Sequence, residues 1–108
     1  MVLALAALGV YSAVSAAEDC EEFFITGYAS DDFPNRTADG TPTLGNEWTL
    51  VATHNRFAFG TIIEIEGLEP LRVADRGLLG YDHLDVLVVT REQAYALTGR
   101  RRACWRDR

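Results

Sequence analysis

The chain has 108 residues, which is enough length for one domain with a modest hydrophobic core. Its formal net charge at pH 7 is −6. Sixteen acidic residues outnumber ten basic ones, all of them arginine, and this excess argues against nucleic acid or an anionic membrane surface as a partner. The exception is the basic cluster of Arg100, Arg101 and Arg102, followed by Arg106 and Arg108. We interpret it as a solvated strand edge or tail, with a contact to an anionic polymer as the alternative.

Residues 1–17 have the composition of a secretory signal peptide. Residues 1–10 are apolar, and residues 14–17 are small enough for a cleavage site. A membrane anchor and a core strand are the alternatives, but the segment has only about 16 apolar residues, fewer than the roughly 20 of a spanning helix. We therefore expect a mature domain of residues 18–108 without a membrane span. It would be secreted, or retained in the periplasm or cell envelope.

Five segments in chain order have the β-branched and aromatic residues, or the period-two alternation, of strands. They are residues 23–28, 48–53, 61–66, 71–74 and 84–89. The polar segment 30–45, between the first two, contains four proline or glycine residues. A loop of that length in a small domain is usually functional or disordered.

Residues 90–99 are predicted to form the only helix. Thr90 is a candidate N-cap, Gln93 completes a capping box, and Gly99 is placed to end the helix. Ala94 and Leu97 should face the core. Residues 101–105 can form a sixth strand. Six short strands and one short helix predict a mainly β fold, a small closed six-stranded barrel.

Two cysteines, Cys20 and Cys104, lie near the two ends of the expected mature domain. Export to an oxidising compartment permits a disulfide between them. Closing a loop of that length would contribute about 4 kcal/mol to stability in the chain-entropy model. Two unpaired thiols are the alternative.

Two aspartates stand where predicted strands meet loops. Asp75 interrupts an apolar run, and Asp85 opens another. An acid against such a run is costly to bury without a partner. Together they suggest a paired-carboxylate site. The alternative is a turn acid beside Arg76 and a strand-end acid, both solvated.

The other polar residues weighed for a site are Thr26, Tyr28, Thr37, Asp39, His54, Arg76, Asp82 and His83. Asp82 is more typical of a turn-stabilising acid than of a catalytic one. Tyr28 could stack on a sugar ring, although aromatic residues in so small a domain are more often core. His54 and His83 lie far apart without a paired ligand, so we expect neither a metal nor a cofactor.

Several short motifs follow one another along the chain. They are Thr26-Gly27-Tyr28, Thr37-Ala38-Asp39-Gly40-Thr41, Val51-Ala52, Phe59-Gly60-Thr61, Ala74-Asp75-Arg76-Gly77, Leu84-Asp85-Val86, Glu92-Gln93-Ala94 and Gly99-Arg100. In this order and spacing they resemble the Asp-Asp-Asp (3D) domain, over about residues 23–105. That family has a six-stranded double-psi β-barrel and includes the C-terminal part of membrane-bound lytic transglycosylase A. Rare lipoprotein A and the expansins have similar barrels.

The resemblance implies an enzyme, expected to be monomeric, that cleaves peptidoglycan glycan strands between N-acetylmuramic acid and N-acetylglucosamine. In lytic transglycosylases one carboxyl group protonates the glycosidic oxygen and then takes the proton of the muramic C6 hydroxyl, which closes a 1,6-anhydro ring without water. Asp85 matches the catalytic acid/base and Asp75 the second aspartate. Repulsion between two carboxylates raises one pKa, as a general acid requires, provided that Arg76 points away. Substrate contacts are expected from Thr37, Tyr28, Thr53, His54, Arg76 and Asp82, and Thr37 could also help to hold a catalytic carboxylate.

The sequence departs from the family at its first aspartate, whose place is taken by Thr53 or His54. This change leaves two alternatives open. One is a non-catalytic barrel that binds cell-wall glycan, of the expansin or rare lipoprotein A type. The other is a water-consuming glycosidase that uses Asp75 and Asp85 as an acid/base pair.

Overall fold

A computed structural model describes residues 18–106, and the expected signal peptide lies outside the described residues. The elements, in chain order, are β1 (Glu18–Ala29), β2 (Leu50–Thr53), β3 (Ile62–Ile65), β4 (Leu71–Arg76), β5 (His83–Val88), α2 (Arg91–Leu97) and β6 (Gly99–Arg106). All six predicted strands and the helix are confirmed. β2 begins two residues later than predicted because Trp48 has φ 66°, a left-handed conformation that a strand does not accommodate. Within residues 18–106, no helix is both long and apolar enough to cross a membrane.

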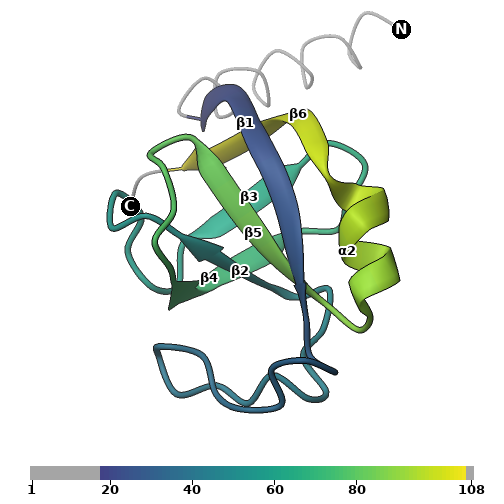
Figure 1. The fold of residues 1–108 in the computed structure, drawn as a ribbon. Helices are drawn as coiled ribbons and strands as arrows, with labels where there is room; N and C mark the ends of the chain where they lie inside the picture. The colour runs from purple at the N-terminus through teal and green to yellow at the C-terminus, as the bar shows by residue number, and fades with distance from the viewer. Residues whose placement is uncertain (1–17, 107–108) are drawn as a thin grey trace, which may run out of the picture.

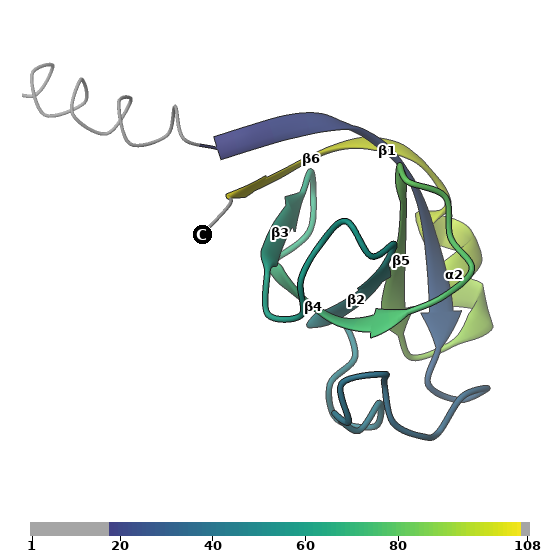
Figure 2. The ribbon, with the colours of Figure 1, turned by 90° about the vertical axis from the view of Figure 1, so that its left-hand side faces the viewer.

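The six strands close into a barrel in the order β1-β5-β2-β4-β3-β6 (Figures 1 and 2). β1 is the longest strand, and it pairs with β6 through its first part and with β5 through its second part. α2 connects β5 to β6 and packs beside β1 at one side of the barrel (Figure 1). The expected mainly β fold, a closed barrel with one short helix, is therefore confirmed.

The strand pairing has an internal two-fold pattern. If β1, β2 and β3 are exchanged with β4, β5 and β6, every pair maps onto a pair of the same direction, either another pair or itself. The parallel pair β1–β5 becomes β4–β2, the antiparallel pair β3–β4 becomes β6–β1, and the pairs β2–β5 and β3–β6 map onto themselves. Two interlocked halves of this kind are the double-psi arrangement of a six-stranded barrel.

Alternate residues of the strands fill the interior, as period two requires. Fully buried examples are Phe23, Ile25, Ile63, Val73, Leu84 and Val86. Ala94 and Leu97 of α2 join this core, as predicted. The helix approaches β1 at Gly27, where an added Cβ would lie 2.8 Å from the Ala94 Cα. Gly27 is therefore needed because the helix packs on its backbone.

The Thr90–Gln93 capping box forms at the start of α2. The Thr90 hydroxyl accepts from the Gln93 backbone N–H, and the Gln93 side chain accepts from the Thr90 N–H. The helix ends at Leu97, and Gly99, with φ 152°, already belongs to β6. The capping box thus sets the start of the helix as predicted, whereas its end has an extended Thr98 as C-cap and no left-handed glycine cap.

Arg56 occupies a cluster of four aromatic rings beside the core. Its guanidinium lies 4.1 Å from the ring centroid of Tyr81, and within 5.4 Å of the centroids of Phe23, Phe57 and Trp105. It also forms an ion pair with Glu21 at 2.6 Å. These contacts attach the loop between β2 and β3 to β1.

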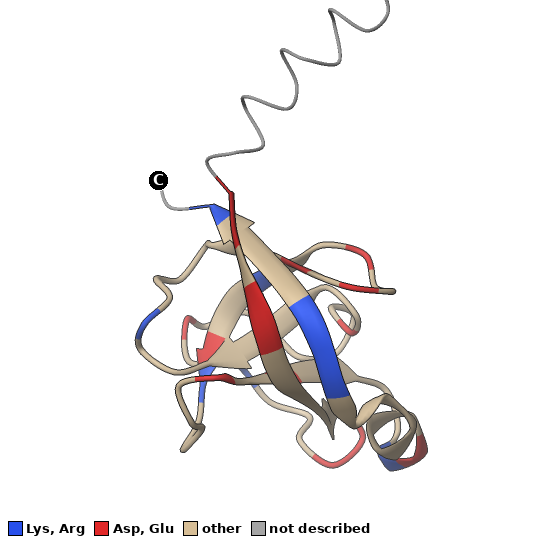
Figure 3. Ribbon diagram, turned by 90° about the horizontal axis from the view of Figure 1, so that it is seen from above, with Lys and Arg blue, Asp and Glu red and all other residues tan. Residues whose placement is uncertain are grey.

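Cys20 and Cys104 form a disulfide, as predicted, at a directly paired position of β1 and β6. The basic cluster is not at a strand edge, because β6 lies between β1 and β3. Arg100, Arg102 and Arg106 are exposed to solvent, as expected, and Arg108 lies outside the described residues. Arg100 pairs with Glu22. In Figure 3 an acidic stretch of β1 lies beside a basic stretch of β6, as the register of the two strands requires.

Replacing both Cys20 and Cys104 by serine should lower the free energy of unfolding by about 4 kcal/mol, because the cross-link restricts the unfolded chain. Chemical denaturation of the variant and of the wild type measures the difference. Reduction of the wild-type protein should reproduce it, whereas a loss below about 1 kcal/mol would contradict the expectation.

Gly27→Ala should lower the free energy of unfolding by about 2 kcal/mol, because the new methyl group meets helix backbone that cannot yield cheaply. Gly80→Ala is the matched control, since its nearest non-neighbouring atom would be 3.6 Å away, an ordinary contact. Equal thermal stabilities for the two variants would show that α2 can move away from β1.

Candidate active site

The two predicted catalytic aspartates lie on the outer face of the barrel, on either side of one β2 residue. Ala52 is the register partner of Asp85 in β5 and of Asp75 in β4. Leu84 and Val86 point into the core, so Asp85 between them points outward. Adjacent strands are about 4.8 Å apart, which places the two aspartate backbones roughly 10 Å from each other. On the other side of β5, Thr26 is the partner of Asp85.

Three donors hold the Asp75 carboxylate. The Tyr28 hydroxyl donates to Oδ2 at 2.8 Å, and the backbone N–H groups of Ala38 and Arg76 both donate to Oδ1 at 2.9 Å. Burial raises the pKa of Tyr28, and so do its hydrogen bond to Asp75 and the nearby charges of Asp75, Asp85 and Asp39. Tyr28 therefore remains a phenol and a donor to Asp75 across the neutral range.

Asp85 is half buried and accepts a hydrogen bond from the Thr26 hydroxyl at 2.8 Å. Burial raises the pKa of Asp85, and the charge of Asp75 adds to the rise. The hydrogen bond from Thr26 and the charge of His83 oppose it, but the net direction is upward. A carboxyl group whose pKa is raised is suited to donate a proton at moderate pH.

Asp39 is a third carboxylate near this site. The hydroxyl groups of Thr37 and Thr41 donate to its Oδ1 at 2.7 Å, and Arg72 pairs with its Oδ2 at 3.0 Å. Burial alone would raise the pKa of Asp39, but these hydrogen bonds outweigh burial and hold it well below its usual range. Asp39 is therefore a permanent anion and not a proton donor.

The loop between β1 and β2 is ordered over the site. Its Asp39 N–H donates to the Ala74 carbonyl at 3.0 Å, and Ser30, Thr37 and Thr43 are buried. The expectation that Thr37 holds a catalytic carboxylate is wrong in one respect: its hydroxyl binds Asp39, and the neighbouring Ala38 N–H binds Asp75.

Arg76 points away from the carboxylates, as the sequence argument required. Its guanidinium donates to the Phe57 carbonyl at 2.7 Å and lies 4.1 Å from the Phe59 ring centroid. Thr53 is fully buried and accepts a hydrogen bond from Arg76 at 3.3 Å. We therefore correct the assignment of Thr53 from a substrate contact to a support for Arg76.

His54 and Asp82 are held by contacts of their own. His54 Nδ1 accepts from the Arg56 N–H at 3.2 Å, and its ring packs edge-on against Tyr81. The Asp82 carboxylate is exposed and faces Arg100 at 3.6 Å, while its carbonyl accepts from the Phe24 N–H. Asp82 thus fits the turn-stabilising role, because none of its hydrogen bonds or ion pairs joins it to Asp75 or Asp85.

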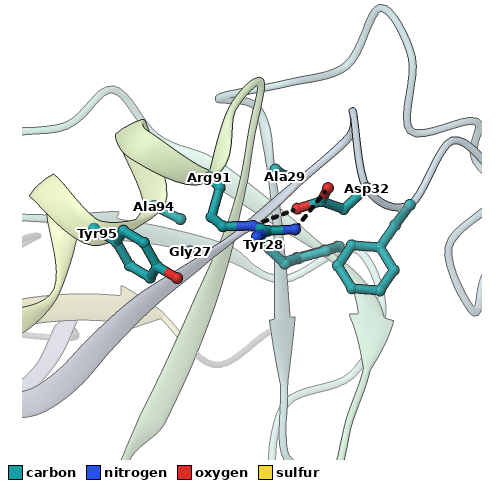
Figure 4. A pocket seen from close by; sticks show the side chains of 8 residues that line it. Gly27, Tyr28, Ala29, Asp32, Arg91, Ala94 and Tyr95 are labelled. Atoms are coloured by element: carbon teal, nitrogen blue, oxygen red, sulfur yellow. Dashed lines mark hydrogen bonds and ion pairs between the residues drawn. The ribbon is translucent and has the colours of Figure 1, made fainter.

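A pocket of about 550 Å³ lies where the end of β1 meets α2 (Figure 4). Tyr28 connects the two features, since its ring lines the pocket and its hydroxyl binds Asp75. Tyr95 and Phe33 also line it, and their side chains are 71% and 55% exposed. Arg91 and Asp32 face each other there as an ion pair at 3.2 Å.

Within residues 18–106, one group of His, Cys, Asp or Glu side chains is close enough to share a metal ion, namely Glu18, Cys20 and Cys104. Its two sulfurs are already bonded to each other in the disulfide, so they are not available as thiolate ligands. The chain matches no protein-family model, no curated protein and no solved structure.

Asp85→Asn should stabilise the protein more at pH 7 than at pH 3. The folded state holds the Asp85 proton more tightly than the unfolded chain, so ionisation of Asp85 destabilises the fold as the pH rises through the raised pKa. Asparagine cannot ionise. Denaturation at the two pH values measures the difference between variant and wild type. If that difference is the same at both, Asp85 has an unshifted pKa.

Proposed function

We propose that the protein is a secreted enzyme that cleaves the glycan strands of peptidoglycan by lytic transglycosylation, with Asp85 as acid/base and Asp75 as its partner. The observation that carries the proposal is the half-buried Asp85 carboxyl with its raised pKa, on one barrel face with a second, rigidly held carboxylate. The ordered motifs that resemble the 3D domain support the same assignment of the two residues.

The proposed reaction uses one carboxyl group twice. Protonated Asp85 donates its proton to the glycosidic oxygen, and the bond to the muramic C1 breaks. The Asp85 carboxylate then takes the proton of the C6 hydroxyl, whose oxygen bonds to C1 and closes the anhydro ring. The Asp75 charge favours the protonated form of Asp85 before the first step. Asp75 itself is held in place by Tyr28 and by two backbone N–H groups.

The pocket beside Tyr28 is the proposed place for a neighbouring sugar of the strand. Exposed aromatic rings offer apolar faces for a pyranose ring, and the Arg91–Asp32 pair offers donors and acceptors for hydroxyl groups. Since Tyr28 belongs both to this pocket and to the Asp75 contacts, a strand bound there would continue toward the carboxylates.

A non-catalytic glycan-binding barrel is the second candidate. It is favoured by the absence of an acid at the position of the family's first aspartate, where Thr53 is buried and His54 is held by Arg56. This candidate predicts that the protein sediments with sacculi but releases nothing, and that Asp85→Asn leaves the sedimentation unchanged.

Digestion of purified sacculi, followed by mass spectrometry, tests the proposal. The wild type should release 1,6-anhydro products, and Asp85→Asn should release at least about 100-fold less, the usual contribution of a general acid. Asp82→Asn is the matched control: it removes a neighbouring exposed aspartate that pairs with Arg100, and it should keep the wild-type rate.

The products separate the candidates. Reducing ends in place of anhydro ends would assign a water-consuming glycosidase. Binding without release by folded protein would assign the non-catalytic barrel.

A further inference from the structure

One hydroxyl group joins Asp85 to a histidine. The Thr26 Oγ lies 2.8 Å from the Asp85 Oδ1 and 2.7 Å from the His83 Nε2. Thr26 and Asp85 are register partners on β1 and β5, and His83 lies two residues before Asp85, so all three share the outer face of this strand pair. The proposed catalytic scheme assigns no role to His83.

The hydroxyl has a single proton, and this restricts the three-residue chain to two arrangements. If Thr26 donates to the Asp85 carboxylate, then His83 Nε2 must carry a proton and donate to Thr26. If Asp85 is protonated and donates to Thr26, then the hydroxyl turns to donate to an unprotonated Nε2. The state of Asp85 therefore dictates whether His83 Nε2 carries a proton.

We infer that Asp85 and His83 share one proton through the Thr26 hydroxyl, which makes His83 a positioning residue for Asp85. In one form of the pair Asp85 is a carboxylic acid and His83 a neutral imidazole protonated on Nδ1. In the other form Asp85 is a carboxylate and His83 an imidazolium. The forms interconvert when Nε2 gives its proton to the Thr26 oxygen as Thr26 gives its own to Asp85, so no proton is gained or lost.

The groups around Asp85, Thr26 and His83 are mostly uncharged or already paired, so they do not compete for the shared proton. His83 packs edge-on against Phe24, with 5.2 Å between ring centroids. Asp82 precedes His83 in the chain, Arg100 is the register partner of Phe24 on its other side, and these two charged groups pair with each other. On the other side of Asp85 lie the uncharged Ala52, the Tyr28 phenol and the Asp75 charge, and the effect of that charge is to favour a proton on Asp85.

The inference deepens the proposed function, because it concerns the proton of the proposed acid/base. Its test does not need an active enzyme. Carbon-13 and nitrogen-15 NMR of the full-length protein can follow the Asp85 carboxyl and the His83 ring across pH 3 to 9. In the wild type both nuclei should report the same titration steps, since the proton belongs to the pair.

Thr26→Val keeps the shape of the side chain and removes the hydroxyl, and it should make the two titrations independent. Thr26→Ser restores the hydroxyl and should restore the shared steps. If Thr26→Val leaves the steps shared, or if the wild type shows independent steps, the inference is wrong.

His83→Gln covers the case in which Thr26→Val does not fold. It removes the imidazolium and should move the Asp85 midpoint to higher pH, since the charge of His83 lowers the pKa of Asp85. An unchanged midpoint would contradict the inference.

Digestion of sacculi keeps this test apart from that of the function. Shared titration with no glycan release would leave the inference standing and remove the proposed enzyme. Glycan release with independent titrations of Asp85 and His83 would support the proposed enzyme and contradict the shared proton.

Discussion

The pairing of β1 with two partners is the constraint on which the barrel and its outer site depend. β6 pairs with the first part of β1, and β5 pairs with its second part. Phe24 and Ile25 pair with both strands. Because side chains alternate along a strand, burying Phe23 and Ile25 obliges Thr26 and Tyr28 to face outward, where they meet the two aspartates. A slip of one residue in this register would move the core residues outside and the polar residues inside.

Within residues 18–106, no arginine forms an ion pair with Asp75 or Asp85, even though the chain contains ten arginines. Arg72 pairs with Asp39, and the Arg76 guanidinium is held against the Phe57 carbonyl and the Phe59 ring. The pKa of Asp85 is therefore set by its burial, by the Thr26 hydroxyl, by His83 and by the second carboxylate, Asp75. Since a guanidinium beside Asp85 would lower its pKa, the placement of the arginines is as important for proton donation as the aspartates themselves.

Much of the fold could be predicted because its signals are local. The alternation around Ile63 and the Thr90–Gln93 capping box lie within a few residues, and two cysteines leave a single possible pairing within the chain. The arrangement of the site, in contrast, depends on strand pairings between residues far apart in sequence. A bulge between Val51 and Ala52 brings Asp75, in place of Ala74, level with Ala52, and the parallel pairing of β1 with β5 brings Thr26 to Asp85. Neither the bulge nor the pairing leaves a local signature, so the contacts that join Thr26 to Asp85 and His83 could not be predicted from the sequence.

The position of the disulfide has a mechanical consequence. Cys20 and Cys104 are 84 residues apart in sequence but face each other on adjacent strands, with Cα atoms 4.1 Å apart. A pulling force applied to the chain outside this pair passes from one strand to the other through the covalent bond. Only the first two residues of β1 and the last two of β6 lie outside it and can be peeled apart. The covalent bond bypasses the segment between the two cysteines, which contains both aspartates, so a load on the ends reaches the barrel only through contacts such as the pairing of Trp105 with Ile63.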